Sequence, residues 1–147
     1  MTAAAALSSS RGFLRGYELC IGNGLPAENG RPNATVPGIV CLAFSVELAI
    51  KSLLMSAAQP AHGHRLDELF YELPQADQQA IMAEIGMEPQ VLQEQLTVAA
   101  NAFVEWRYIY ESPGRHSINA AFLVAFSMAS IAIAQRHVNS MRKRVAR

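Results

Sequence analysis

The sequence predicts an all-α protein, a single-domain antiparallel helical bundle of about four long helices and two short ones over residues 1–147. Three observations predict this fold class. Apolar residues recur at spacings of three and four, and no stretch alternates apolar and polar residues as a strand does. Clusters of glycine and proline divide the chain into segments of helical length. The 147 residues fit one ordinary domain, and 51% of them are hydrophobic, which is enough for a packed core.

The N-terminal part of the domain, residues 1–36, is expected to hold one helix and one loop. The helix spans residues 3–21 and ends where Gly22 begins a Gly-Asn-Gly sequence. The loop spans residues 22–38 and is rich in Gly, Pro and Asn, which favour turns. The core of the domain is expected to be residues 37–147.

The first core helix is expected over residues 37–58. Its two polar sets lie on nearly opposite sides of a 100° helical wheel, and apolar residues flank both sets. One side carries Ser45, Ser52 and Ser56, and the other carries Glu47 and Lys51. A helix that is apolar almost all round is surrounded by neighbours, so this one is expected at the centre of the bundle.

The remaining helices follow in order. Two short helices are expected over 65–73, which Pro74 ends, and over 75–85, which Gly86 ends. Proline is favoured in a first helical turn, so Pro89 is expected to begin a long helix. A regular seam predicts five turns there: Leu92, Leu96, Ala99, Phe103, Trp106 and Tyr110. After a Ser-Pro-Gly break at 112–114, a last helix is expected over 117–145, apolar all round in its first half and narrowing to an apolar stripe.

Composition limits the class of protein. Lys+Arg and Asp+Glu both number 12, which excludes a strongly basic nucleic-acid-binding surface as a property of the whole chain. Two cysteines, Cys20 and Cys41, are typical of a reduced, cytoplasmic protein with two buried thiols. The start of the chain lacks the basic region of a secretory signal. Residues 117–134 carry no charge, but their Ala, Ser and Asn content favours a buried core helix over a membrane span. We therefore expect no membrane association.

Charge is unevenly distributed along the chain. The segment 66–94 contains seven acidic residues and no Lys or Arg. The C-terminal segment 136–147 contains no acidic residue and a basic tail, in which Arg136, Arg142, Lys143 and Arg144 are followed by Arg147. Two interpretations stay open. The segments are solvated faces, with the tail favoured by the helix dipole, or they form a phosphate-binding tail or a complementary contact between subunits.

Familiar motifs for metal or nucleophilic sites are missing from the sequence. It contains neither a Gly-rich phosphate loop nor an HExxH motif, and the His62 and His64 pair has no second cluster to complete a metal site. No metal and no cofactor are therefore expected.

A polar group on two helices remains. Glu47 and Lys51 are spaced for a helical ion pair, with the acid first. Arg107 lies about one position off the apolar seam, with Tyr108 on the opposite face and Glu111 one turn later. If the two helices pack antiparallel, Glu47 or Lys51 is expected to meet Arg107 or Glu111. This network either fixes helix register or faces a ligand or RNA.

Three segments follow one another in a fixed order: FSVELAIKSLLM (44–55), GHRLDELFYELP (63–74) and FVEWRYIYE (103–111). In this order they resemble HEPN domains, small all-helical domains named from higher eukaryotes and prokaryotes nucleotide-binding. The resemblance covers residues 37–147 in outline. It is strongest at Glu47, Lys51, Gly63, His64, Leu66, Leu69, Phe70, Trp106, Arg107, Tyr108, Tyr110 and Glu111. The aspartate that usually follows the His is shifted, since Arg65 follows His64 and Asp67 comes later.

The resemblance implies a bundle that commonly forms a homodimer, in a prokaryotic defence, toxin–antitoxin or stress system. Many members are metal-independent ribonucleases whose signature is Arg, four to six residues, then His. In that chemistry the His takes the 2′-hydroxyl proton, and the Arg stabilises the charge that develops on the phosphate. None of the four histidines here has an Arg at that spacing. Arg107 and His116, with eight residues between them, are the nearest candidate catalytic pair.

Three hypotheses follow. The first is a HEPN-like module that self-associates and binds a protein, nucleotide or RNA, with Glu47, Lys51, His64, Tyr108 and Glu111 as its polar network or binding residues. The second is a divergent HEPN ribonuclease that uses Arg107 and His116. The third is an accessory subunit that is stable only with a protein partner from a neighbouring gene.

Overall fold

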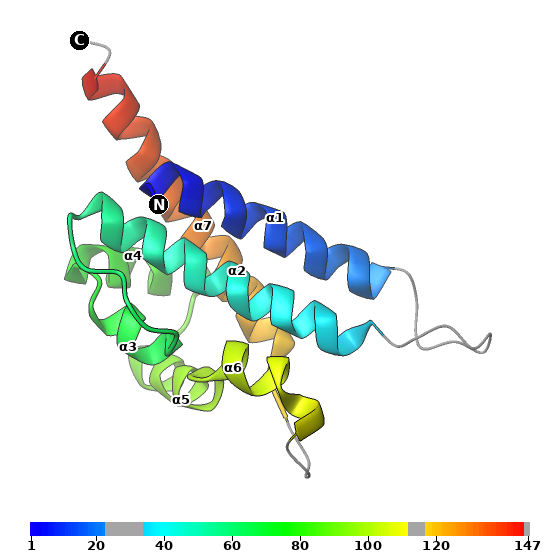
Figure 1. The fold of residues 1–147 in the computed structure, drawn as a ribbon. Coiled ribbons are helices and arrows are strands. Elements are labelled where there is room, and N and C mark those ends of the chain that lie inside the picture. Colours follow the sequence, from blue (N-terminus) through cyan, green and yellow to red (C-terminus); the bar gives the residue numbers. More distant parts are fainter. Residues whose placement is uncertain (23–33, 112–116, 146–147) are drawn as a thin grey trace.

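A computed structural model describes residues 1–22, 34–111 and 117–145 of the chain (Figure 1). Within those ranges every regular element is a helix, which confirms the all-α fold class. The elements are α1 (Ala3–Gly22), α2 (Thr35–Ser56), α3 (Leu66–Tyr71), α4 (Gln75–Ile85), α5 (Pro89–Ala99), α6 (Ala102–Arg107), the 3-10 turn η1 (Ile109–Glu111) and α7 (Ala120–Val145).

Helix α2 is the centre of the bundle, as its pattern predicted. Helix α1 runs antiparallel along it and α7 packs on it from another side (Figure 1). Buried serines join the three long helices. The Ser10 hydroxyl donates to the Ser45 carbonyl at 2.7 Å, and the Ser45 hydroxyl lies 2.7 Å from that of Ser127. Small side chains at this contact let α1 and α2 approach closely, and the hydroxyls of Ser10, Ser45 and Ser127 each have a hydrogen-bonding partner.

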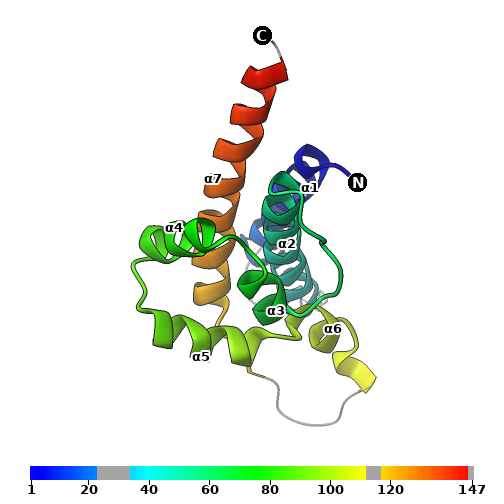
Figure 2. The same ribbon diagram turned by 90° about the vertical axis from the view of Figure 1, so that its left-hand side faces the viewer.

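The hydrophobic core lies between α2, α7 and the short helices α3 to α6, which cover one flank of α2 (Figure 2). Its largest fully buried side chains are Phe70, Phe126, Leu42, Ile50, Leu53, Leu54, Leu66, Leu69, Ile81, Leu92, Leu96 and Leu123. Burying one such side chain contributes about 1.5–3 kcal/mol. The apolar face of α3 is buried in this core. Tertiary packing therefore stabilises this short helix more than its intrinsic helix propensity does.

The prediction of one continuous helix from Pro89 to Tyr110 is wrong, because the segment divides into α5 and α6 at residues 100 and 101. The Ala100 carbonyl accepts a hydrogen bond from the Leu66 amide at 2.9 Å, which ties the break to the start of α3. Leu92, Leu96 and Ala99 before the break and Phe103 after it are buried, and Trp106 is partly buried. Helix α5 packs on α3, while α6 packs on α2. One straight rod could not reach both neighbours. The side chain of Tyr110 lies outside the described residues.

Some helix ends also differ from the prediction. Helix α2 begins at Thr35, so Pro37 lies in its first turn, where its missing N–H is not needed. Helix α7 begins at Ala120, because Asn119 caps it by accepting from the Phe122 amide at 3.0 Å. Over the described ranges the bundle therefore has three long helices, where about four were predicted. The predicted loop at 23–33 and the break at 112–116 lie outside the described residues.

Two helices of the described part of the chain are long and apolar enough to cross a membrane by length and composition alone. They are Thr35–Ser56 and Ala120–Arg144, and only the second was singled out from the sequence. In the fold, 78% of the first helix's apolar window and 50% of the second's are buried. A core helix of a bundle passes the same test of length and composition.

The two cysteines lie on the facing helices α1 and α2. Cys20 and Cys41 are both free and half-buried, so the expectation of two buried thiols is met only in part. Burial raises the pKa of the Cys41 thiol, and the neighbouring Cys20 raises it further. Cys41 is therefore a weakly reactive thiol at neutral pH.

Candidate functional site

The candidate site is built around a buried carboxylate on the central helix. Glu47 has a side chain that is only 1% exposed, and its Oε1 lies 2.7 Å from the ammonium of Lys51, one turn later on α2. The ion pair predicted from the spacing is therefore present. A buried charge must be paired, since leaving it unpaired costs several kcal/mol. Lys51 supplies that pairing for Glu47.

His64 completes this cluster from the loop between α2 and α3. Its Nδ1 lies 3.0 Å from Glu47 Oε1 and 3.1 Å from Oε2. The loop residue before it, Gly63, has a φ of +84°, a conformation that favours glycine. We call Glu47, Lys51 and His64 the Glu47 cluster.

The contact with Glu47 determines the tautomer of the neutral His64 ring. A carboxylate can only accept, so Nδ1 carries the proton and Nε2 carries the lone pair. The His64 side chain is 55% exposed, and within the described part of the chain Nε2 has no hydrogen-bonding partner. The cluster therefore holds the half-exposed imidazole in one orientation, with Nδ1 on the Glu47 carboxylate.

An aromatic platform lies beside the cluster. The Phe103 ring of α6 stacks on Phe44 of α2 at 4.7 Å and lies 5.5 Å from the His64 ring, centroid to centroid. The Arg107 guanidinium lies 5.5 Å from the centre of the same Phe103 ring. It also lies over the Tyr108 ring at 4.6 Å and donates to the Tyr108 hydroxyl. Phe103 thus brings His64 and Arg107 to one surface.

Arg107 does not occupy the place expected from the sequence. In the described residues no ion pair joins Arg107 or Glu111 to Glu47 or Lys51. Arg107 and Glu111 are both exposed. The break between α5 and α6 explains the difference, because it turns Phe103 toward α2 and leaves Arg107 at the surface. Of the predicted network, Glu47, Lys51 and His64 come together, while Arg107 and Tyr108 form a separate pair alongside.

The other cation near this surface is already neutralised. Arg65 contacts Asp67 at 2.7 Å and Glu68 at 2.9 Å. The hydrogen bond that Arg65 donates to Asp67, and then the charge of Asp67, raise the pKa of the Arg65 guanidinium. Arg107 has no acidic partner in the part of the chain that the structure describes, so it is the cation more available to an anionic ligand.

Other predictions for the site concern His116 and a metal ion. His116, the expected catalytic partner of Arg107, is outside the described residues. Over the ranges the structure covers, no three side chains of His, Cys, Asp or Glu gather where a metal ion could bind. The stacking role of Phe103 was missed, since its place in the apolar seam indicated only a core residue.

The basic tail and the acidic segment meet within the chain. His137 Nε2 of α7 lies 2.8 Å from the buried Asp77 of α4, and Arg136 lies 3.5 Å from Glu84. Arg142, Lys143 and Arg144 are exposed on the end of α7 that projects beyond the other helices (Figure 2). Part of the charge complementarity seen in the sequence is therefore used to hold α4 against α7.

Comparisons with family models, with curated proteins and with solved structures find no match to this chain.

Proposed function

We propose that this protein is a HEPN-like helical module that binds RNA at the surface formed by His64, Arg107 and Tyr108 around the buried Phe103 ring. One observation carries the proposal: the half-exposed His64 ring, held by a buried carboxylate, shares the Phe103 platform with an unneutralised arginine. Single-stranded nucleic acid is held by aromatic stacking for its bases and by cations for its phosphates. An arginine can also bind a phosphate through two N–H groups at once.

The wider setting of the proposal rests on the resemblance in the sequence. We propose a cytoplasmic homodimer in a prokaryotic defence, toxin–antitoxin or stress system, with a further protein partner encoded by a neighbouring gene. A free nucleotide has the same base and phosphate groups as RNA. It is therefore the natural competitor in a binding assay.

The binding experiment uses fluorescence anisotropy with a labelled single-stranded RNA of twelve nucleotides. Arg107→Ala and His64→Ala should each weaken binding about tenfold or more, since each removes one recognition group. Arg15→Ala is the matched control, because Arg15 is an exposed arginine of α1 that pairs with Glu18. Equal affinities for the wild type and the two site variants, or an equal loss in the control, would count against this surface as the binding site.

A second candidate function is cleavage of the bound RNA, and the free Nε2 of His64 favours it. In that reaction His64 takes the 2′-hydroxyl proton, O2′ attacks the adjacent phosphorus, and the 5′-oxygen leaves to give a 2′,3′-cyclic phosphate. Arg107 would stabilise the charge that develops on the phosphate oxygens. The hypothesis of a divergent ribonuclease gives the role of general base to His116 instead.

An experiment with two variants distinguishes His64 from His116 as the general base. RNA is incubated with the protein in EDTA, and the ends of the products are identified by mass spectrometry. Loss of cyclic phosphate in His64→Ala but not in His116→Ala supports His64, and the reverse result supports His116. Equal cleavage by both variants and the wild type would mean that neither histidine is the base.

A further inference from the structure

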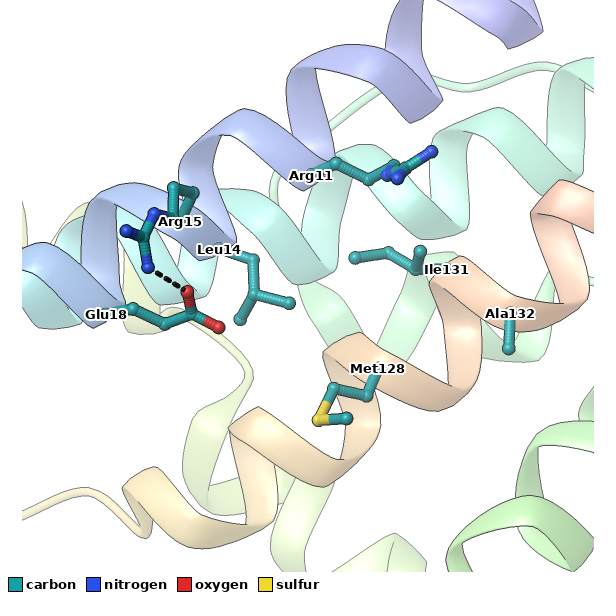
Figure 3. Close-up of a pocket in the computed structure, with 7 residues that line it drawn as sticks. All are labelled: Arg11, Leu14, Arg15, Glu18, Met128, Ile131 and Ala132. Atoms are coloured by element: carbon teal, nitrogen blue, oxygen red, sulfur yellow. Dashed lines mark hydrogen bonds and ion pairs between the residues drawn. The ribbon is translucent and has the colours of Figure 1, made fainter.

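A groove runs between α1 and α7, away from the Glu47 cluster. Both helices pack on α2 but separate along their length, and side chains from each line the space between them (Figure 3). The floor of this α1/α7 groove is apolar, with Leu14 from α1 and Met128 and Ile131 from α7. Met128 is 58% exposed. Part of this apolar floor is therefore open to the side chains of a partner.

The rim of the α1/α7 groove carries more basic than acidic side chains, since Arg11, Arg15 and Glu18 line the hollow in Figure 3. Arg11 lines both the hollow in Figure 3 and a second hollow that Arg142 lines further along α7. Among the described residues, the Arg11 guanidinium donates only to the neutral amide oxygen of Gln135, at 3.3 Å. In the described ranges no carboxylate pairs with Arg11 or Arg142, whereas Arg15 pairs with Glu18 at 3.0 Å. The groove therefore favours an occupant with apolar and acidic side chains.

The same chain carries such a surface on α5. Val91 and Val98 are seven residues apart, so they share one side of the helix, and they are 45% and 62% exposed. Glu94 lies between them on that side, and Glu88 precedes the helix; both are exposed. Neither acid has an ion pair with any described residue. We call these four residues the α5 outer face.

We propose that the α5 outer face of one copy docks in the α1/α7 groove of a second copy. Arg11 and Arg142 complement Glu88 and Glu94, and the valines cover the apolar floor. The two hollows measure about 280 and 270 Å³. That is just below the roughly 300–1,000 Å³ of small-molecule pockets, and it suits the side chains of a docked helix. The inference rests on the self-association in the proposed function and assigns its surfaces.

The contact joins two different surfaces, because α5 lies away from α1 in both ribbon views (Figures 1 and 2). Each copy therefore presents one groove and one α5 outer face, and in the proposed homodimer the contact forms twice, with the α5 outer face of each copy in the groove of the other. A copy with a disabled groove should still pair with a copy whose α5 outer face is disabled, because each keeps the surface that the other needs. This property gives a test that a general loss of folding cannot imitate.

The experiment measures the mass of the full-length protein by sedimentation velocity. Met128→Asp places an acid in the groove floor, and Val98→Asp places one on the α5 outer face. Each variant alone should be monomeric where the wild type associates, a weakening of about tenfold or more. An equimolar mixture of the two should associate again. Val104→Asp is the matched control, since Val104 is an exposed apolar residue of α6 outside both surfaces.

A charge reversal tests the polar part of the same contact. Arg11→Glu and Glu94→Arg should each weaken association, and their mixture should associate more strongly than either alone. Association of the single aspartate variants as in the wild type, or a mixture that stays monomeric, would overturn the assignment of these surfaces while leaving self-association intact. A wild-type protein that is monomeric at all concentrations would instead remove self-association itself. RNA binding by the Met128→Asp and Val98→Asp variants is measured in a separate anisotropy experiment.

Discussion

Substituting Lys51 by methionine tests whether the Glu47 cluster is held together by its buried charges. Methionine keeps the length of the side chain and removes only the ammonium. In the wild type that ammonium lies 2.7 Å from Glu47 Oε1, and the two side chains are 10% and 1% exposed. The variant therefore leaves a buried carboxylate whose only remaining partner in the cluster is His64.

The expected loss of stability follows from this geometry. Breaking a buried ion pair by removing one partner costs about 3–5 kcal/mol. His64 still donates to the carboxylate, so we expect the lower end of this range, about 3 kcal/mol. For a chain of about 150 residues each kcal/mol shifts the melting temperature by about 2–4 °C, so the fall should be roughly 6–12 °C.

The assay is urea and thermal unfolding followed by circular dichroism at pH 7. Lys143→Met is the matched control, since Lys143 is exposed on α7, and it should stay within about 0.5 kcal/mol of the wild type. The double variant Glu47→Leu, Lys51→Met removes both charges. It should regain most of the lost stability, because apolar residues can replace a buried ion pair at little cost.

Two results would refute the reasoning. One is a Lys51→Met protein within about 0.5 kcal/mol of the wild type, which would mean that Glu47 does not need the ammonium. The other is a double variant that is less stable than Lys51→Met alone. That result would mean that the loss came from packing and not from an unpaired charge.

Further predictions concern other parts of the bundle. His137→Ala should cost about 1–3 kcal/mol, since it leaves a buried carboxylate of α4 without its partner. Arg136→Ala breaks only an exposed pair and should cost less than about 1 kcal/mol; an equal loss in both would contradict this difference. Because its pKa is raised, Cys41 should react with iodoacetamide more slowly than free cysteine at pH 8, with a smaller difference at higher pH; mass spectrometry measures both rates. Gly12→Ala should raise stability by about 0.5–1 kcal/mol, because the added methyl group meets open space within a helix. Gly86→Ala should lower stability by about 1 kcal/mol, because φ there is +71°; melting temperatures distinguish the two signs.

The local features of the fold were accessible from the sequence. The central place of α2 followed from its two opposed polar sets, and the Glu47–Lys51 pair followed from a spacing of one helical turn. The end of α4 at Gly86 followed from the freedom of glycine to adopt a positive φ. Each of these depends on residues close together in the chain, where backbone geometry alone determines which side chains meet.

The candidate site was only partly accessible in the same way. His64 had been placed in the polar network, but nothing in its neighbourhood showed that its Nδ1 would reach Glu47, seventeen residues earlier. Arg107 was expected to meet that network directly, and it lies instead beside Phe103. Sequence periodicity assigns a residue to a helix face but does not specify which neighbour that face will meet.

The sequence by itself determined that this chain is helical, which residues form its core faces, and that an acid and a base share one side of the central helix. Only the tertiary structure decided where the seam helix breaks and that the His64 ring contacts the buried Glu47 carboxylate. It also decided that α1 and α7 separate into a groove. The physical reason is range. Helical periodicity acts over one or two turns, whereas the Leu66–Ala100 hydrogen bond and the Phe103 stack join segments tens of residues apart. Such contacts form only when the whole bundle packs together.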